Sequence, residues 1–138
     1  MTLKFTVPGN PFGKERPRFG AGNTHTPQKT KDYEELVAWS YRQQCGAKHF
    51  PHGTALELAV MAYMPIPKSA SRKDRERMIT GDIRPTVTPD WDNIGKIISD
   101  ALNKVAYDDD KAIVDGYVRK WYSEDPHVEV IIKEAIPY

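Results

Sequence analysis

Two aspartates in the middle of the chain, Asp90 and Asp92, have the type and spacing that most directly suggest chemistry. They are separated by one residue and follow Pro89, so an extended backbone there would project both carboxylates to the same side. Two carboxylates on one face do not ionise together cheaply unless a cation lies between them. Mg²⁺ is the natural cation, because it takes oxygen ligands and usually binds one or two carboxylates together with phosphate and water.

A second acidic group, Asp108-Asp109-Asp110, follows one predicted helix later. Three adjacent carboxylates repel one another unless positive charge offsets them. If the fold brings the two acidic segments together, they would hold one or two divalent metal ions. Such ions generate a nucleophilic water and stabilise the attacking and leaving oxygens of a phosphoryl displacement. Helix capping is the alternative for Asp90, but it does not explain Asp92 and the later acidic run together.

The segment between these acids has the clearest helical pattern in the sequence, over residues 91–104. Asp92, Lys96 and Asp100 are four residues apart and share its polar face. Lys96 is therefore placed to contact a scissile phosphate or to help activate water, although a weak surface ion pair is the alternative. The apolar stripe consists of Ile94, Ile97, Ile98, Ala101, Leu102 and Val105.

Basic residues concentrate in two segments, although the net charge is only +1. One lies in a long loop rich in glycine and proline, residues 9–26, and the other follows Pro67. Basic segments flanking an acidic centre are typical of proteins that cut nucleic acid, but each segment alone could be ordinary solvated surface. The candidate DNA-binding residues are Lys14, Arg16, Arg18, Lys68, Arg72, Lys73 and Arg75.

The chain has 138 residues, enough for one domain with a buried core. No apolar run approaches the roughly 20 residues of a membrane span, and the first residues lack the character of a signal peptide. The single cysteine, Cys45, excludes a disulfide within the chain and fits a reducing compartment. We therefore expect a cytoplasmic globular protein. Cys45, His49 and His52 form a small cluster, but zinc would need a fourth ligand, so a helix end followed by a loop is the preferred interpretation.

The expected elements alternate between strands and helices, which predicts a single α+β (mixed α/β) domain over residues 1–138. A mixed sheet of about four strands would pack against two main helices. Thr26 and Pro27 are expected to begin the first helix, and Ser69 or Ser71 to cap a short charged one. The turn at residues 123–126 predicts a hairpin between the last two strands. The predicted strands are 2–8, 54–64, 112–123 and 127–134, and the predicted helices are 28–45, 72–79 and 91–104.

The acidic centre resembles the RusA family of Holliday-junction resolvases. The resemblance rests on Asp90-x-Asp92-Asn93-x2-Lys96-x3-Asp100-x-Leu102, followed by Tyr107-x-Asp109-Asp110 and a β-branched strand. Two N-terminal patterns also look like the phage and prophage members: Pro8-Gly9-x-Pro11 and Lys14-x-Arg16-Pro17-Arg18. The similarity spans most of the chain and is densest over residues 88–115.

The resemblance implies a small homodimeric endonuclease, dependent on Mg²⁺ or Mn²⁺, that nicks two opposed strands of a four-way DNA junction in recombination and repair. It implies that Asp90, Asp92 and Asp110 bind the metal, with Asp109 as the alternative for the last position, and that Lys96 is catalytic.

Two features depart from the family pattern: Tyr107 stands where tryptophan is usual, and Asp108 adds a third acid. A two-fold dimer would suit the approximate symmetry of a junction. The alternatives are a metal-dependent nuclease acting on other branched or single-stranded nucleic acid, and a nucleic-acid-binding protein without catalysis.

Overall fold

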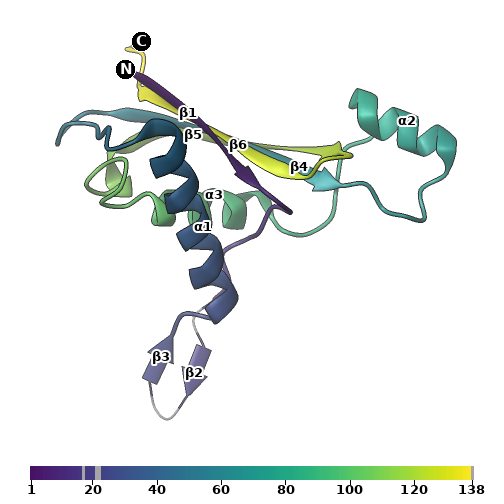
Figure 1. The fold of residues 1–138 in the computed structure, drawn as a ribbon, viewed down its shortest axis with the longest axis horizontal. Helices are drawn as coiled ribbons and strands as arrows, with labels where there is room; N and C mark the ends of the chain where they lie inside the picture. The colour runs from purple at the N-terminus through teal and green to yellow at the C-terminus, as the bar shows by residue number, and fades with distance from the viewer. Residues whose placement is uncertain (17, 21–22, 138) are drawn as a thin grey trace.

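The computed structural model describes residues 1–16, 18–20 and 23–137, and it is organised around one mixed four-stranded sheet (Figure 1). The strand order is β1-β6-β4-β5. Neighbours are antiparallel except for the parallel pair β4 and β5. The predicted single α+β domain with a mixed sheet is confirmed. The strands are β1 (Thr2–Pro8), β4 (Leu56–Pro65), β5 (Ile113–Ser123) and β6 (His127–Glu134).

Two helices, α1 (Gln28–Cys45) and α3 (Trp91–Ala101), lie on the same side of the sheet (Figure 1). The predicted bounds of α1 are confirmed, but its N-cap residue is Pro27, with no side-chain cap, rather than Thr26. Helix α3 ends earlier than expected because Lys104 adopts a left-handed conformation, with φ of 63°. Its N–H donates to the Tyr107 carbonyl over 2.7 Å, which closes a turn.

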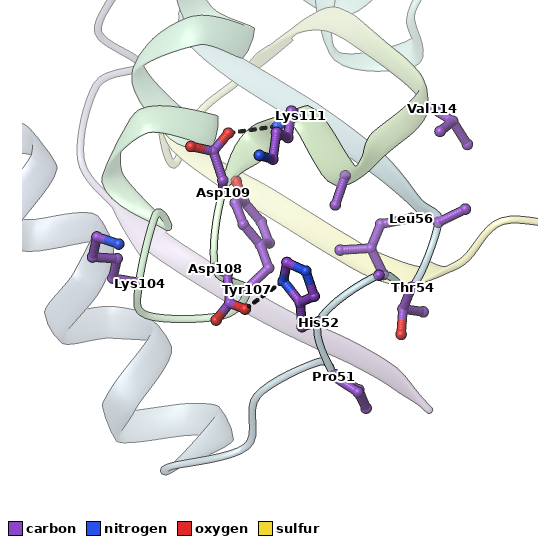
Figure 2. Close-up of a pocket in the computed structure, with 13 residues that line it drawn as sticks. Pro51, His52, Thr54, Leu56, Lys104, Tyr107, Asp108, Asp109, Lys111 and Val114 are labelled. Carbon is purple, nitrogen blue, oxygen red and sulfur yellow. Dashed lines mark hydrogen bonds and ion pairs between the residues drawn. The ribbon is translucent and has the colours of Figure 1, made fainter.

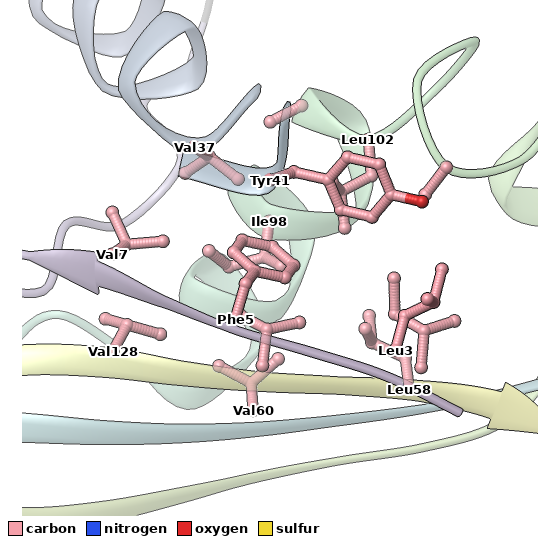
Figure 3. Close-up of a cluster of buried hydrophobic side chains, with 14 of the residues drawn as sticks. Leu3, Phe5, Val7, Val37, Tyr41, Leu58, Val60, Ile98, Leu102 and Val128 are labelled. Atoms are coloured by element: carbon pink, nitrogen blue, oxygen red, sulfur yellow. The ribbon is translucent and has the colours of Figure 1, made fainter. Parts of the chain in front are cut away.

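The core fills the space between these helices and the sheet (Figure 3). Alternation along β1 sends Leu3, Phe5 and Val7 inward. The Phe5 ring meets the Tyr41 ring edge to face, with centroids 5.4 Å apart. The apolar stripe of α3 supplies the opposite wall: Ile94, Ile97, Ile98 and Leu102 are fully buried. The polar face of α3, which carries the candidate site, is thereby turned away from the core.

Two basic projections extend from this body (Figure 1). One is a short hairpin of β2 (Arg18–Gly20) and β3 (Asn23–His25), within the segment expected to be only a loop. The other is α2 (Arg72–Thr80), which buries no residue. Helix α2 begins at the predicted cap, where the Ser71 hydroxyl accepts a hydrogen bond from the Asp74 N–H over 3.1 Å.

The predicted hairpin between the last two strands is wrong. Strands β5 and β6 lie on opposite sides of β4, so residues 123–126 carry the chain past β4 instead of joining neighbours. Burial explains the order: β6 alternates fully buried side chains with half-exposed ones, as a covered internal strand does, whereas β5 is partly exposed along its length. Among the described residues, no helix is long and apolar enough to span a membrane.

Candidate active site on helix α3

Helix α3 begins with the two aspartates that the sequence singles out. Asp90 occupies the N-cap position, yet its side chain caps no N–H group. Its backbone carbonyl accepts the Ile94 N–H over 3.1 Å, so it starts the helix through the main chain alone. Asp92 follows in the first turn, and both side chains are exposed. The capping alternative for Asp90 therefore receives no support, and both carboxylates face solvent.

The loop after β1 runs directly against this end of α3. The Lys14 N–H donates to the Asn93 carbonyl over 2.8 Å. Gly13 makes the close approach, because a Cβ there would lie 2.8 Å from the Pro89 Cβ and 3.2 Å from the Asn93 Cβ. The main chain beside Asp90 is thus positioned by a glycine in a distant part of the sequence.

The segment before Asp90 is held to strand β5. The Arg84 guanidinium donates through Nε to the Lys120 carbonyl over 3.0 Å and stacks 3.6 Å from the centre of the Trp121 ring. The Lys120 ammonium in turn donates to the Val87 carbonyl. These contacts hold residues 84 and 87 of the loop that delivers Asp90 to α3 against β5.

Two lysines meet on Asp100, two turns after Asp92. Lys14 Nζ lies 3.2 Å from Asp100 Oδ2 and 3.0 Å from Glu34 Oε2 on α1. Burial lowers the pKa of Lys14, but these two carboxylates outweigh burial and hold the pKa above its ordinary value. Lys96 Nζ lies 3.5 Å from the same Asp100 oxygen, and the Lys96 side chain is 61% exposed. Lys96 is thus oriented along the polar face yet open to an approaching phosphate.

Asp110 belongs to a short 3₁₀ turn, residues 110–112, beside Asp100. Its N–H donates to Asn103 Oδ1 over 2.8 Å. Burial raises the pKa of the Asp110 carboxyl, and the neighbouring Asp109 and Asp100 carboxylates raise it further. Asp109 caps the turn by accepting the Lys111 N–H over 2.9 Å. Negative charge is therefore in excess around Asp110.

Asp108, the extra acid, is held by two histidines. His49 Nε2 lies 2.9 Å from Asp108 Oδ1, and His52 Nδ1 lies 3.0 Å from Oδ2 (Figure 2 shows the His52 contact). Hydrogen bonds from the two histidines lower the pKa of Asp108. With both oxygens engaged, Asp108 fastens the loop after α1 to the acidic turn. Cys45 takes no part, because its thiol donates to the Lys4 carbonyl over 3.6 Å.

The described residues contain no group of three His, Cys, Asp or Glu side chains arranged to hold a metal ion. Asp92 and Asp100 are eight residues apart on one helix, about 12 Å along its axis. Asp110 lies at the Asp100 end, and Asp90 and Asp92 begin the helix. The donor chemistry nevertheless fits a hard divalent cation, because every candidate ligand is a carboxylate. The pKa of Asp110 is raised first by burial and then by the Asp109 and Asp100 carboxylates, whose charge such a cation would offset.

The predicted DNA-binding residues are divided between the two projections and the adjoining loops. Arg16 and Lys68 are exposed on loops, and Arg72 and Lys73 are exposed on α2. Arg75 Nη2 lies 3.6 Å from Glu124 Oε2. The side chain of Arg18 lies outside the described residues. Lys14 differs from the others because its ammonium is paired inside the protein.

Three residues near the acidic centre were missed as part of the site. The sequence could have indicated Asp100 as a site residue, since it lies one turn after Lys96 on the same face of the helix. Nothing in the sequence links His49 and His52 to the acidic centre. Their partner Asp108 lies more than 50 residues away in the sequence, and only the tertiary fold brings them together.

Comparisons with known proteins show the family to which the chain belongs. The family model of endodeoxyribonuclease RusA matches residues 8–133, which include every candidate catalytic residue. The chain is also similar to the uncharacterized protein YqaN of Bacillus subtilis (strain 168), with 40% identity over an alignment 142 positions long that covers 96% of each chain. The chain therefore belongs to the RusA family of endodeoxyribonucleases, whose members act on Holliday junctions.

Proposed function

We propose that this RusA-family protein is a metal-dependent, structure-selective endonuclease that resolves four-way DNA junctions by paired nicks, as a homodimer, in recombination and repair. The observation that carries the proposal is the polar face of α3. Free carboxylates at Asp90 and Asp92 begin this face, an exposed lysine continues it, and the charge-crowded Asp110 lies beside its other end.

Asp90, Asp92 and Asp110 would hold Mg²⁺, with Mn²⁺ as a second option, and Asp109 is the nearest substitute for Asp110. When bound, the ion supplies a nucleophilic water and charge stabilisation at the phosphate. Lys96 contributes a positive charge that Asp100 keeps on the polar face, where it can meet a phosphate oxygen. Asp108 is not assigned to the metal, because His49 and His52 occupy both of its oxygens.

The basic projections would bind the DNA backbone on either side of this centre. Contacts from Arg16 and from α2 to phosphates would supply affinity without reading sequence. A two-fold dimer would present two equivalent centres to the two symmetric strands of a junction. The same chemistry could serve flaps or single strands, so substrate shape is the property to be measured.

The direct test compares wild type with Asp90→Asn, Asp92→Asn and Asp110→Asn on a synthetic four-way junction in Mg²⁺. Each variant should bind the junction and fail to cut it. Asp92→Asn and Asp110→Asn should also bind more tightly than wild type without metal, because each substitution removes repulsion against phosphate. Asp125→Asn, an exposed acid in the turn between β5 and β6, is the matched control and should cut normally.

Cleavage by both Asp90→Asn and Asp110→Asn at the wild-type rate would overturn the catalytic assignment. Parallel reactions on a flap and a single strand of the same sequence decide the substrate class. Wild type should cut the junction in preference to both, and equal cutting of all three would replace the proposal with a nuclease of broader substrate range.

A further inference from the structure

Trp91 is exposed in a way that the fold does not explain. It is the first residue of α3, it separates Asp90 from Asp92, and its side chain is 63% exposed. An indole has one of the largest apolar areas of any side chain, so an exposed tryptophan loses the stabilisation that burial of this area would give. The other large apolar side chains of the helix are fully buried: Ile94, Ile97 and Ile98.

A narrow groove of about 250 Å³ opens beside Trp91, between the first half of α3 and strands β4 and β5. Its floor is tight, because a Cβ on Gly95 would lie 3.2 Å from Val118 Cγ2. Glycine also stands at position 116 of β5, so no side chain fills the groove from that residue. Strand alternation turns the Tyr117 ring to the opposite face, where the Arg119 guanidinium lies 4.8 Å from it. Tyr117 therefore borders the groove with its main chain.

The lining of the groove selects against charged phosphate and in favour of a flat, uncharged group. Apart from Asp92, the described side chains that line it are apolar or aromatic, and none is a lysine or arginine. The described lining has no lysine or arginine to pair with a phosphate, and the metal ion proposed for Asp92 would serve the phosphodiester that is cut, not a second phosphate in the groove. In the described part of the chain β5 pairs only with β4, so the N–H and C=O groups on its outer edge have no strand partner, although the Lys120 carbonyl accepts from Arg84. Those groups can hydrogen-bond the edge of a heterocycle.

We propose that this groove, with the Trp91 indole as its stacking surface, holds an unpaired nucleobase of the DNA beside the phosphodiester that is cut. The proposal rests on the proposed nuclease function and adds a basis for its choice of substrate. At a branch point a base pair lacks a stacking neighbour on one side, so one base leaves its pair at lower cost than in continuous duplex. Base–aromatic stacking then stabilises the complex by about 1–3 kcal/mol.

The test measures binding of Trp91→Ala and Trp91→Phe to a four-way junction and to a duplex of the same sequence, in EDTA so that no cutting occurs. Trp91→Ala should weaken junction binding by about 5- to 150-fold, the equivalent of the stacking energy, and leave duplex binding unchanged. Trp91→Phe should retain most of the affinity. Trp39→Ala, which removes a 57% exposed tryptophan from α1, is the matched control and should bind both DNAs as wild type does.

Equal losses on junction and duplex, or no loss, would overturn the groove proposal. It would also be overturned if light scattering showed that Trp91→Ala dissociates a wild-type dimer, since a second copy would then cover the groove. Cleavage of the junction by wild type is measured separately. Absence of cutting rejects the proposed function, whereas normal cutting with unchanged junction selectivity in Trp91→Ala rejects only the nucleobase site.

Discussion

Lys14 and Asp100 form an ion pair, with 3.2 Å between Nζ and Oδ2, that joins the loop after β1 to α3. The same ammonium lies 3.0 Å from Glu34 Oε2, so one lysine ties the loop to both helices. The three side chains are only 19–21% exposed. Lys14 was predicted from sequence as a phosphate contact, and its geometry favours a structural role in the free protein.

Lys14→Met is expected to lower the free energy of unfolding by about 1–3 kcal/mol, because it removes the cation beside the mostly buried Glu34 carboxylate and leaves Asp100 with only the more exposed Lys96. Lys14 has a raised pKa, so its contribution is present below the ordinary lysine value of about 10.4 and is lost as pH rises through the raised value. Urea unfolding at pH 7 measures the effect. Arg16→Met, on an exposed neighbour, should change stability by less than about 0.5 kcal/mol; equal losses in both variants would contradict the structural role.

Gly13→Ala tests whether the loop after β1 positions Asp90. The new methyl group would lie 2.8 Å from the Pro89 Cβ, so the loop or the segment carrying Asp90 must move. We expect a loss of junction cleavage together with a fall in Tm. Gly116→Ala is the stability control, because the nearest atom to its Cβ would be 3.7 Å away, an ordinary contact, and its Tm should not fall. A Gly13→Ala variant with wild-type cleavage and Tm would show that the close approach is unimportant.

The double variant Arg72→Ala/Lys73→Ala tests α2 as a DNA-binding arm. Helix α2 buries no residue, so the substitutions should leave the fold intact. Junction binding should weaken, and the slope of log K against log salt should become less negative by about 2, near one unit for each lost phosphate contact. Arg42→Ala/Lys48→Ala removes the same charge near the end of α1 and should leave the slope nearly unchanged. Identical slopes in all three proteins would assign α2 a different role.

Local sequence patterns predicted the helices and strands of this fold more reliably than they predicted which strands lie side by side in the sheet. The apolar stripe of α3 and the alternation of β1 are properties of adjacent residues, so the sequence reveals them directly. The order of β5 and β6 depends on which strand β4 accepts on each side, and a turn sequence at residues 123–126 does not encode that choice. The early end of α3 depends on the conformation of Lys104, which a helical pattern does not reveal.

The candidate site was predictable to the same extent. Asp90, Asp92 and Lys96 lie within two helical turns, and the exposure of Asp92 and Lys96 follows from the period of α3. The choice among the three later acids required tertiary contacts. Asp108 binds His49 and His52. Asp109 caps a turn, whereas Asp110 lies beside other carboxylates that raise its pKa. No spacing rule in the sequence distinguishes these three environments.

The raised pKa of Asp110 has a consequence for stability. Burial and the neighbouring Asp109 and Asp100 carboxylates raise it above the ordinary aspartate value of about 3.9. A group with a raised folded-state pKa contributes stability below its unfolded value, and this contribution is lost as pH rises through the raised value. Above that raised value the ionised Asp110 therefore destabilises the metal-free fold, and a bound cation would offset that cost.

Asp110→Asn should consequently raise Tm in EDTA at pH 7, by about 2–5 °C, while abolishing cleavage. Mg²⁺ should raise the Tm of wild type in proportion to the logarithm of its concentration once the site is saturated, and should raise the Tm of Asp110→Asn little or not at all. Asp108→Asn separates the roles of adjacent acids: it should lower Tm in EDTA, because it weakens the contacts to His49 and His52, and retain the Mg²⁺-dependent rise. Thermal melts with and without Mg²⁺ provide all of these values. A full Mg²⁺ response in Asp110→Asn, with its loss in Asp108→Asn, would transfer the metal-binding assignment to Asp108.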